Sequence, residues 1–240
     1  MNTSSRKDGR QASELRPFAV EWDPMGFALS SVIVRTGQTA VLCSVCREEG
    51  VPRWRRDQGL GWLSAEYRLL PGSTPERQRR EWLKLSGRTQ EIQRLIGRSL
   101  RAVIDLQALG ERQITVDCDV IQADGGTRTA AITGAWVALK MATAYLIEEG
   151  VLKSDPVYGQ LAAISCGVID GETRLDLEYE EDSSAEADAN FVLTSDGGIV
   201  EIQATAEDRP MAEPDFLELF SLAKAGVAEL SEIQLKALEK

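Results

Sequence analysis

The sequence predicts an α+β protein, and three features of the chain support that prediction. Strand-like runs rich in β-branched residues alternate with helical patterns, in the order β-α-β-α. The spacing of the strand patterns is typical of mixed antiparallel sheets. A segment from about Thr127 to Glu149 is apolar on nearly all sides, which predicts a helix buried at the centre of the fold. We therefore expect two similar β-α halves in one core, as a single domain over residues 1–240 whose N-terminal end is partly flexible.

In the first half of the chain, the predicted strands lie at 17–46, 62–67 and 112–121. The first of these runs alternates between apolar and polar residues and contains a turn at Thr36-Gly37, so it holds two or three antiparallel strands. An arginine-rich loop is expected over 47–60, and Pro71-Gly72-Ser73 is a turn signal. A charged helical pattern then runs from Glu76 to about Val103, with apolar residues at helical spacing toward its end.

In the second half, the predicted strands lie at 161–169, 173–179, 190–194 and 198–205. A short acidic turn is expected between the second and third of them, over 180–188. The last predicted element is an amphipathic helix at 213–238. The apolar face of this helix is formed by Phe216, Leu219, Phe220, Ala223, Val227 and Leu230.

Composition limits the class of protein. With 43% apolar and 27% charged residues over 240 positions, the chain is expected to be globular rather than disordered. The residues from Met1 to Asp8 are polar and lack the apolar centre of a signal peptide. No stretch of the sequence is expected to reach the ~18 apolar residues that a membrane helix requires. We therefore expect no membrane partner and a cytoplasmic location.

Charge is distributed unevenly along the chain. The net charge is −11, but residues 1–140 hold 21 Lys and Arg against 16 Asp and Glu, whereas residues 141–240 hold 6 against 22. Twelve arginines fall between Arg47 and Arg101. This asymmetry fits a basic surface for a polyanion and an acidic half that holds cations. It fits equally well an ordinary solvated surface whose complementary halves meet in an oligomer.

The chain has no histidine, which excludes histidine-based catalytic triads and histidine metal sites. Proton transfer near neutral pH would then fall to carboxylates, lysine, tyrosine or cysteine. Cys43 and Cys46 have CxxC spacing, but they lie in a strand-like run, where residues three apart point to opposite faces. Cys118 and Cys166 are distant from both. We expect no zinc site, and buried thiols in a reducing compartment.

The segment QADGGTRTAA, from Gln122 to Ala131, is the strongest local signal for a site. A strand-like run enters two glycines, which are followed by Thr127 as a candidate cap and by the apolar helix. Backbone N–H groups at a helix start have no intrahelical partner and lie at the positive end of the helix dipole, so they attract anions. Arg128 adds a planar fork suited to phosphate oxygens. The spacing matches neither of the common nucleotide-binding glycine motifs, and by itself it also fits a capped turn with a surface arginine.

Two carboxylates in the acidic half are candidates for catalysis. Asp182 and Asp188 lie six residues apart and flank a loop or a single helical turn that could direct both toward one point. Such a pair suits a Mg²⁺ ion, or one metal ligand beside one general acid or base. Arg88, in the first turn of a predicted helix, could supply a second phosphate contact. By composition alone the acidic segment also fits an exposed loop, and structural ion pairs would explain Arg94, Arg98 and Arg101.

Several long motifs, in order along the chain, resemble the ribonuclease PH family. They are GRTQEIQRLIGRSLRAV at 87–103, DGGTRTAAITGA at 124–135, DLEYEEDSSAEADAN at 176–190, GWLSAEY at 61–67, and Lys7-Asp8-Gly9-Arg10 with Arg16-Pro17. The resemblance covers about residues 6–237. The chain departs from the family pattern at Glu178, at Arg68, and in the segments 22–28 and 53–56.

The resemblance implies a fold, a function and a set of site residues. It implies the ribonuclease PH fold, which is similar to domain 2 of ribosomal protein S5, and a phosphorolytic 3′→5′ exoribonuclease that trims tRNA precursors. Inorganic phosphate would be the co-substrate, bound by Arg88, Gly126, Thr127 and Arg128. The catalytic carboxylates, which would also hold Mg²⁺ or alternatively Mn²⁺, would be Asp182 and Asp188. RNA would be contacted by Arg68, Arg77 and Arg80. The assembly would be a homohexamer built as a trimer of dimers.

Two other functions fit part of this pattern. A catalytically inactive ring subunit would only bind RNA or partner subunits, but such subunits typically lack some of the phosphate and acid positions, all of which are present here. A member biased toward polymerisation would differ in the ratio of its forward and reverse rates. The sequence leaves open which carboxylate binds metal and which acts as the acid, with Asp188 preferred as the acid.

Overall fold

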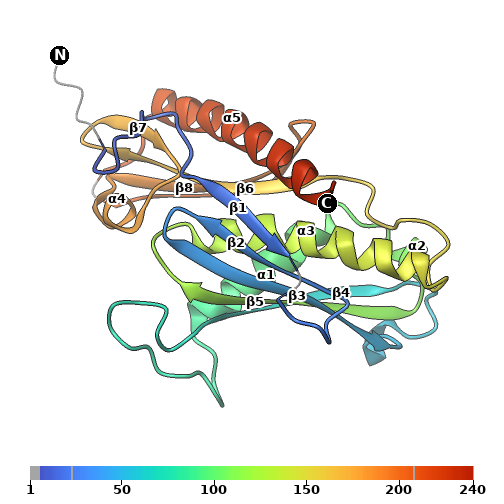
Figure 1. Cartoon of the computed structure of the whole chain (residues 1–240). Coiled ribbons are helices and arrows are strands. Elements are labelled where there is room, and N and C mark those ends of the chain that lie inside the picture. The colour runs from blue at the N-terminus through green and yellow to red at the C-terminus, as the bar shows by residue number, and fades with distance from the viewer. Residues whose placement is uncertain (1–5, 23, 208, 240) are drawn as a thin grey trace.

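The computed structural model describes residues 6–22, 24–207 and 209–239. The start of the chain through Ser5, and Asp23 in the divergent segment 22–28, lie outside the described residues. Four layers follow one another across the molecule, namely a five-stranded sheet, a layer of helices, a four-stranded sheet and a C-terminal helix (Figure 1). This arrangement buries both faces of the second sheet and one face of the first.

The five-stranded sheet has the order β1-β2-β3-β5-β4. Its strands are β1 (Phe18–Trp22), β2 (Ser30–Thr36), β3 (Thr39–Glu49), β4 (Trp62–Leu69) and β5 (Arg112–Gln122). Neighbouring strands are antiparallel except β4 and β5, which run parallel. A parallel pair requires a long crossover, which α1 (Gly87–Arg101) and α2 (Leu106–Leu109) supply. The position of α1 is important for the site, because Arg88 lies in its first turn.

The four-stranded sheet is antiparallel throughout and has the order β7-β6-β8-β9. Its strands are β6 (Leu161–Ile169), β7 (Glu172–Leu175), β8 (Ala187–Thr194) and β9 (Ile199–Ala206). The strand β6 is buried along its whole length, because its side chains alternate between two hydrophobic clusters. Leu161 and Ala163 belong to the cluster around α3 (Thr127–Glu148), and Ala162 and Ile164 to the cluster beneath α5 (Glu213–Leu238).

The helix α3 lies between the two sheets (Figure 1), and most of its side chains are buried. The prediction that no segment is long and apolar enough to cross a membrane is wrong for this helix, which meets that criterion by length and composition. Its burial explains the composition, since a helix with a sheet on either side is apolar all round. The helix therefore belongs to the core of the fold.

The α+β architecture is confirmed, and both long helices begin and end within one residue of the predicted positions. The charged helical pattern expected from Glu76 is wrong in its first part, because α1 begins only at Gly87. Between Glu76 and Ser86 the side chains are exposed or only partly buried, so nothing holds that segment as a helix. Ser86 sets the start of α1, since its hydroxyl accepts a hydrogen bond from the Thr89 N–H at 3.1 Å.

The region around the acidic segment also differs from its prediction. The strand expected over 173–179 ends at Leu175, because Asp176 takes a left-handed φ of 53°. The acidic turn expected over 180–188 contains a short helix, α4 (Tyr179–Ser184), and its last residues already belong to β8. Asp182 therefore lies on a helix and Asp188 on a strand.

The remaining corrections concern the loop over 47–60 and the cysteines. β3 continues through Glu49, and a short 3-10 helix (Arg53–Arg55) lies inside the loop.

All four cysteines are free, and Cys43 and Cys46 point to opposite faces of β3 as predicted. Cys46 is exposed, however, which corrects the expectation that every thiol is buried. It lies on the face of the sheet opposite α3, which none of the described helices covers.

Candidate active site

A cavity of about 780 Å³ lies between the two halves of the fold. Its lining includes the glycine segment before α3, the start of α1, residues of α4 and β8, and Glu207 just after β9. The structure thus brings together six residues that the sequence singled out, from four separate places in the chain: Arg88, Gly126, Thr127, Arg128, Asp182 and Asp188.

One end of the cavity is the N-terminus of α3. The helix is capped by Gly126 in a left-handed conformation (φ 64°), and no side chain caps it. The expectation that Thr127 is the cap is therefore wrong, since Thr127 is the first helical residue. Its hydroxyl instead hydrogen-bonds the buried Tyr67 hydroxyl at 2.8 Å. The leading backbone N–H groups of α3, which lack intrahelical acceptors by geometry, are thus available to an anion in the cavity.

Gly125, the residue before this cap, is required by close packing. It has a φ of 72°, and a Cβ atom placed there would lie 2.6 Å from the carbonyl oxygen of Leu177. The glycine segment therefore touches the backbone that leads into α4. This contact joins the anion-binding end of α3 to the element that holds Asp182.

Two arginines supply positive charge to the cavity. Arg128 donates a hydrogen bond to the side-chain oxygen of Gln203 at 2.9 Å and lies 3.6 Å from the Glu91 carboxylate. Gln203 in turn donates to Glu91 at 2.9 Å, so three elements orient the Arg128 guanidinium. Arg88 is exposed in the first turn of α1 and lines the cavity from the other side. Two guanidinium groups and a helix N-terminus form a site suited to a phosphate-sized anion.

The two carboxylates come from the second half of the fold. Burial raises the pKa of the Asp182 carboxyl, and the charges of Arg88 and Arg128 oppose this effect. Burial also raises the pKa of the Asp188 carboxyl, and repulsion from Asp182 and Glu207 adds to the rise. A carboxyl with a raised pKa keeps its proton to a higher pH, which a general acid requires. Asp188, with two acidic neighbours, has the environment that the acid role calls for.

The same two carboxylates are also candidate ligands for a metal ion. Among the described residues there is no group of three or more His, Cys, Asp or Glu side chains that could hold a metal ion. Two half-buried carboxylates facing one cavity do fit Mg²⁺, which is commonly bound through one or two carboxylates, waters and substrate phosphate oxygens. The donor set therefore fits a hard cation bound together with substrate.

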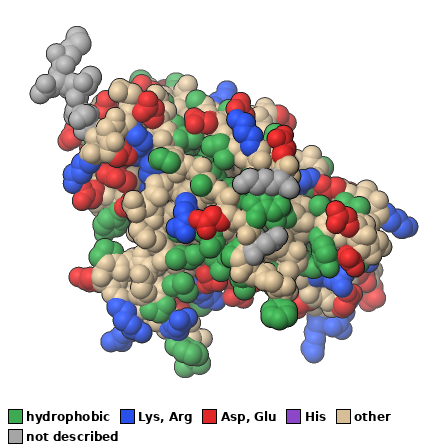
Figure 2. All heavy atoms as spheres, viewed as in Figure 1, with side chains coloured by type: hydrophobic (Ala, Val, Ile, Leu, Met, Phe, Trp, Pro, Cys, Tyr) green, Lys and Arg blue, Asp and Glu red, His purple; other side chains and the backbone are tan. Residues whose placement is uncertain are grey.

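The predicted RNA-binding arginines lie beside this cavity rather than in it. Arg68 and Arg80 line a second cavity of about 620 Å³, and Arg88 lines both cavities. Arg77 is exposed on the loop after β4 and lines neither. In Figure 2, basic side chains gather at the lower left, over this loop as placed in Figure 1. The two cavities and the loop together form a continuous basic approach to Arg88.

Sequence reasoning missed several residues of the site. Tyr67 and Gln203 orient Thr127 and Arg128, while Asn190, Glu207 and Tyr179 line the cavity. Tyr67, Tyr179 and Asn190 fall inside motifs that carry the family resemblance, so their position in those motifs was a usable signal. Glu207 and Gln203 lie outside those motifs, and only the pairing of β9 with β8 brings them to the site.

The comparisons with known proteins agree with this geometry. Two sequence models, described as the 3′ exoribonuclease family, domain 1 and domain 2, match residues 14–144 and 159–226. The chain belongs to the 3′ exoribonuclease family. Within that family, it is 68% identical to the ribonuclease PH of Maricaulis maris over 98% of this chain and 99% of that protein. It is 64% identical to the ribonuclease PH of Parasynechococcus marenigrum, over 98% of this chain and 95% of that protein. Relatives that match nearly end to end are thus ribonuclease PH.

Solved structures of more distant proteins share the fold. One is the Archaeoglobus fulgidus exosome with RNA bound to the active site, with a TM-score of 0.81 at 21% identity over 95% of this chain and 92% of that one. Another is rice (Oryza sativa) Rrp46, with a TM-score of 0.79 at 22% identity over 97% of this chain and 100% of that one. These likenesses confirm the predicted ribonuclease PH fold. The prediction that residues 1–240 form a single domain stays a prediction.

Proposed function

We propose that this chain, a phosphate-dependent 3′→5′ exoribonuclease that processes tRNA precursors, performs its reaction in the cavity between the two halves of the fold. The observation that supports this most directly is the composition of the cavity wall. One side offers a helix N-terminus with two arginines, and the other offers two carboxylates of raised pKa. This is a complete set of groups for displacement by phosphate at a phosphodiester.

In this proposal orthophosphate is bound by Arg88, Arg128 and the backbone at Gly126 and Thr127. The guanidinium groups and N–H groups neutralise its charge and hold one oxygen in line with the last phosphodiester of an RNA 3′ end. Gln203 and Glu91 keep Arg128 in place before phosphate arrives. The protein's contribution is mainly positioning and charge neutralisation, because phosphoryl transfer needs little covalent chemistry from side chains.

The chemical step forms one bond and breaks one. An oxygen of orthophosphate bonds to the phosphorus of the last phosphodiester, and the bond from that phosphorus to the 3′ oxygen of the penultimate nucleotide breaks. Asp188 gives its proton to the departing 3′ oxygen. The products are a nucleoside diphosphate and an RNA one nucleotide shorter. Because one phosphoester-type bond replaces another, the reaction is reversible and adds nucleotides from nucleoside diphosphates.

We propose Mg²⁺ as the cofactor, with Mn²⁺ able to replace it, held by Asp182 and in part by Asp188 together with substrate oxygens. When bound, the metal supplies positive charge close to the developing negative charge of the transition state. Asp182 suits this role better than the acid role, because Arg88 and Arg128 oppose the rise in its pKa. The arginine charges around Asp182 thus favour its ionised form, whereas the acidic neighbours of Asp188 disfavour ionisation there.

Three further parts of the proposal concern partners and location. Arg68, Arg77 and Arg80 contact the RNA upstream of its 3′ end, which the exposure of Arg77 and Arg80 and the place of Arg68 and Arg80 in the second cavity support. The chain assembles as a homohexamer, a trimer of dimers, for which the exposed apolar Met25 and Phe27 offer contact surface. We place the enzyme in the cytoplasm, which the free thiols of all four cysteines support. Light scattering on the purified chain tests the mass of six copies.

The function is tested with a tRNA that carries extra 3′ nucleotides. The purified chain is incubated with it in the presence of Mg²⁺, with and without orthophosphate, and the released nucleotides are separated by chromatography. Nucleoside diphosphates should appear only when phosphate is present, and added nucleoside diphosphates should extend the RNA. Release of nucleoside monophosphates in phosphate-free buffer would show that water is the nucleophile and would disprove the proposal.

A further inference from the structure

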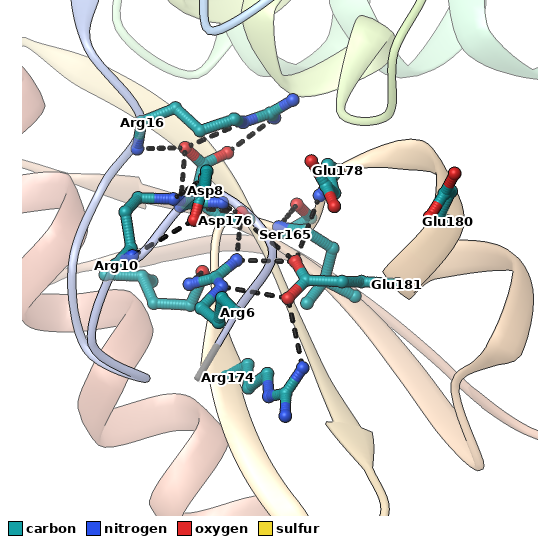
Figure 3. Close-up of polar contacts among 12 residues, drawn as sticks. Arg6, Asp8, Arg10, Arg16, Ser165, Arg174, Asp176, Glu178, Glu180 and Glu181 are labelled. Carbon is teal, nitrogen blue, oxygen red and sulfur yellow. Dashed lines mark hydrogen bonds and ion pairs between the residues drawn. The ribbon is translucent and has the colours of Figure 1, made fainter. Parts of the chain in front are cut away.

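The segment before β1 forms a buried set of ion pairs that the proposed mechanism does not use. Arg6 and Arg16 are each only 4% exposed, and their carboxylate partners Asp176 and Glu181 are also buried. Figure 3 shows the Arg16 side chain pointing toward Asp176 and the Arg6 side chain pointing toward Glu181. Burying ion pairs is costly, and well-packed apolar residues often stabilise a fold as well. Ion pairs of this cost point to a role beyond stability.

Arg16 joins the two halves of the site. Its guanidinium donates to both carboxylate oxygens of Asp176, at 3.1 and 2.7 Å, and its backbone N–H donates to the same carboxylate at 2.8 Å. The remaining nitrogen donates to the carbonyl oxygen of Asp124 at 2.6 Å. Asp124 immediately precedes the two glycines of the phosphate-binding segment, and Asp176 lies on the path to α4. A single guanidinium thus fixes the spacing between these two backbones.

Close packing holds Arg16 in this position. A Cβ atom on Gly126 would lie 2.9 Å from a terminal nitrogen of Arg16, so the guanidinium rests against the cap of α3 itself. A Cβ atom on Gly37, in the turn between β2 and β3, would lie 2.7 Å from the Arg16 Cδ atom. The side chain is therefore confined along its stem and at its head by two glycines. A displacement of Arg16 has to be transmitted to the cap of α3.

Arg6 makes the corresponding contacts with α4. It binds Glu181 with two hydrogen bonds of 2.9 and 2.6 Å, and it donates to the carbonyl oxygens of Leu175 and Asp176 at 2.8 Å each. Glu181 also accepts from Arg174 at 3.1 Å and forms a capping box with Glu178 at the start of α4. Asp182 is the next residue. The orientation of this short helix, and with it the Asp182 carboxylate, depends on the Arg6–Glu181 pair.

We propose that Arg16 is a positioning residue for the phosphate-binding segment, and that Arg6 is the matching positioning residue for the helix that holds Asp182. Neither side chain is among those that line the cavity, so both act through the backbone and through their carboxylate partners. The inference rests on the proposed function, because it assigns the two arginines to different parts of that one reaction. It predicts that their loss affects different kinetic constants.

The test replaces each arginine by lysine, since Arg6→Lys and Arg16→Lys keep the positive charge but remove the fork that makes several directed contacts. In Arg16→Lys the KM for orthophosphate should rise roughly tenfold, while kcat at saturating phosphate and the KM for RNA stay near those of the unaltered chain. In Arg6→Lys, kcat should fall roughly tenfold with the KM for phosphate unchanged. A purely structural role would lower the unfolding temperature without this separation of constants.

A second variant keeps the test usable if Arg16→Lys does not fold. Gly37→Ala places a methyl group against the stem of Arg16 and should also raise the KM for phosphate. Gly150→Ala is its matched control, because Gly150 likewise has a left-handed φ (70°), but nothing lies within 4 Å of the added Cβ atom. Gly150→Ala should cost similar backbone strain and leave the KM for phosphate as it was.

The outcomes separate this inference from the function on which it rests. A folded Arg16→Lys enzyme with an unchanged KM for phosphate, or a Gly150→Ala enzyme that matches Gly37→Ala, would overturn the inference. Arg128→Gln removes a direct phosphate contact in the same assay. If Arg128→Gln raises the KM for phosphate and Arg16→Lys does not, only the positioning role fails. If neither raises it, the phosphate site of the proposed function fails as well.

Discussion

At the scale of single residues, the carboxyl groups of the candidate site differ from neighbouring carboxyl groups in the charges that surround them. Burial raises the pKa of both Asp182 and Asp188, and two acidic neighbours add to the rise at Asp188. Asp176 and Glu181, a few residues away, are instead held by the buried arginines Arg16 and Arg6. The chain thus holds Asp176 and Glu181 in buried ion pairs, whereas the pKa of each proposed catalytic carboxyl stays raised despite nearby arginines, as expected where protons and cations must bind.

The raised pKa of Asp188 gives a prediction for Asp188→Asn. Because the folded state binds this proton more tightly than the unfolded chain, ionisation at neutral pH lowers stability, and the loss disappears as the pH falls through the raised pKa. Asp188→Asn should therefore unfold at a higher temperature than the unaltered chain at pH 7, and the difference should shrink in acid. Its turnover should fall at least ~100-fold through loss of the acid.

Two measurements check this prediction. Thermal unfolding of both proteins is followed at pH 7 and at acid pH, and release of nucleoside diphosphates is measured at saturating phosphate. Phosphate should still raise the unfolding temperature of Asp188→Asn, because the phosphate contacts are intact. Near-normal phosphorolysis by Asp188→Asn would show that another group donates the proton.

At the scale of elements, α3 determines the geometry of the site because it is held on both sides. Its N-terminus delivers backbone N–H groups to the cavity, while its length is packed between the sheets (Figure 1). The helix approaches the first sheet closely at Gly134, where an added Cβ atom would lie 2.7 Å from both methyl groups of Val34 and 3.0 Å from the Cys43 sulfur. The helix cannot move away without disturbing the second sheet.

This contact predicts that Gly134→Ala destabilises the protein despite a gain in helix propensity. Alanine favours a helix over glycine by ~1 kcal/mol, but overpacking a core costs ~1–3 kcal/mol. Val34 cannot yield easily, because a β-branched side chain on a strand has restricted rotamers. The net loss, up to about 2 kcal/mol, is measured by urea unfolding.

Gly97→Ala in α1 is the matched control. There the nearest atom to the added Cβ atom is the flexible end of Arg101 at 3.0 Å, and the nearest backbone atom is at 3.6 Å. This variant should be neutral or more stable by up to ~1 kcal/mol. Equal effects at the two glycines would show that α3 has more room between the sheets than the distances indicate.

At the scale of the whole molecule, the fold places arginines in three different settings. Arg6 and Arg16 are buried in ion pairs, Arg88 and Arg128 face the cavity, and Arg77 is exposed on the loop after β4. On the same loop the side chain of Trp82 is 84% exposed and that of Leu83 is fully exposed. A net charge of −11 is therefore compatible with RNA binding, because basic residues are grouped around the two cavities.

This grouping predicts separate effects for the loop and cavity arginines. Arg77→Gln and Arg80→Gln should each raise the KM for tRNA and reduce the slope of log affinity against log salt by about 1, because each removes one phosphate contact. The KM for orthophosphate should not change. Steady-state kinetics over a range of salt concentrations measures both quantities. Arg35→Gln, which breaks only an exposed pair with Glu21, serves as the control. A changed KM for orthophosphate in Arg77→Gln would place that residue in the phosphate site instead.

Much of the fold could be predicted from local pattern, and the errors have physical causes. α3 and α5 were predicted to within a residue, since their long apolar patterns are typical only of helices. The failure at 76–86 arose because a charged pattern without a buried face resembles a solvated helix. The failure at Asp176 arose because its left-handed backbone is stabilised by Arg16, which lies 160 residues away.

In the candidate site, too, local pattern predicted some residues and missed others. The candidates for its phosphate-binding and acid residues came from motifs, because a helix start with glycines and paired acids has chemical meaning within a short segment, and their roles stay a prediction. Tyr67, Gln203 and Arg16 were not given roles, since each acts through a partner distant in sequence. Their roles depend on which strands and loops are neighbours, and no local pattern encodes that.

The sequence by itself determined the fold class and the family resemblance, and it supplied the candidates for the reacting groups, because these depend on residue type and on spacing within single elements. Only the tertiary structure decided that the glycine segment touches the entrance to α4, that two carboxylates share one cavity with two arginines, and that buried arginines join the two halves. The physical reason is that proximity, burial and the resulting pKa shifts arise when separate elements pack together.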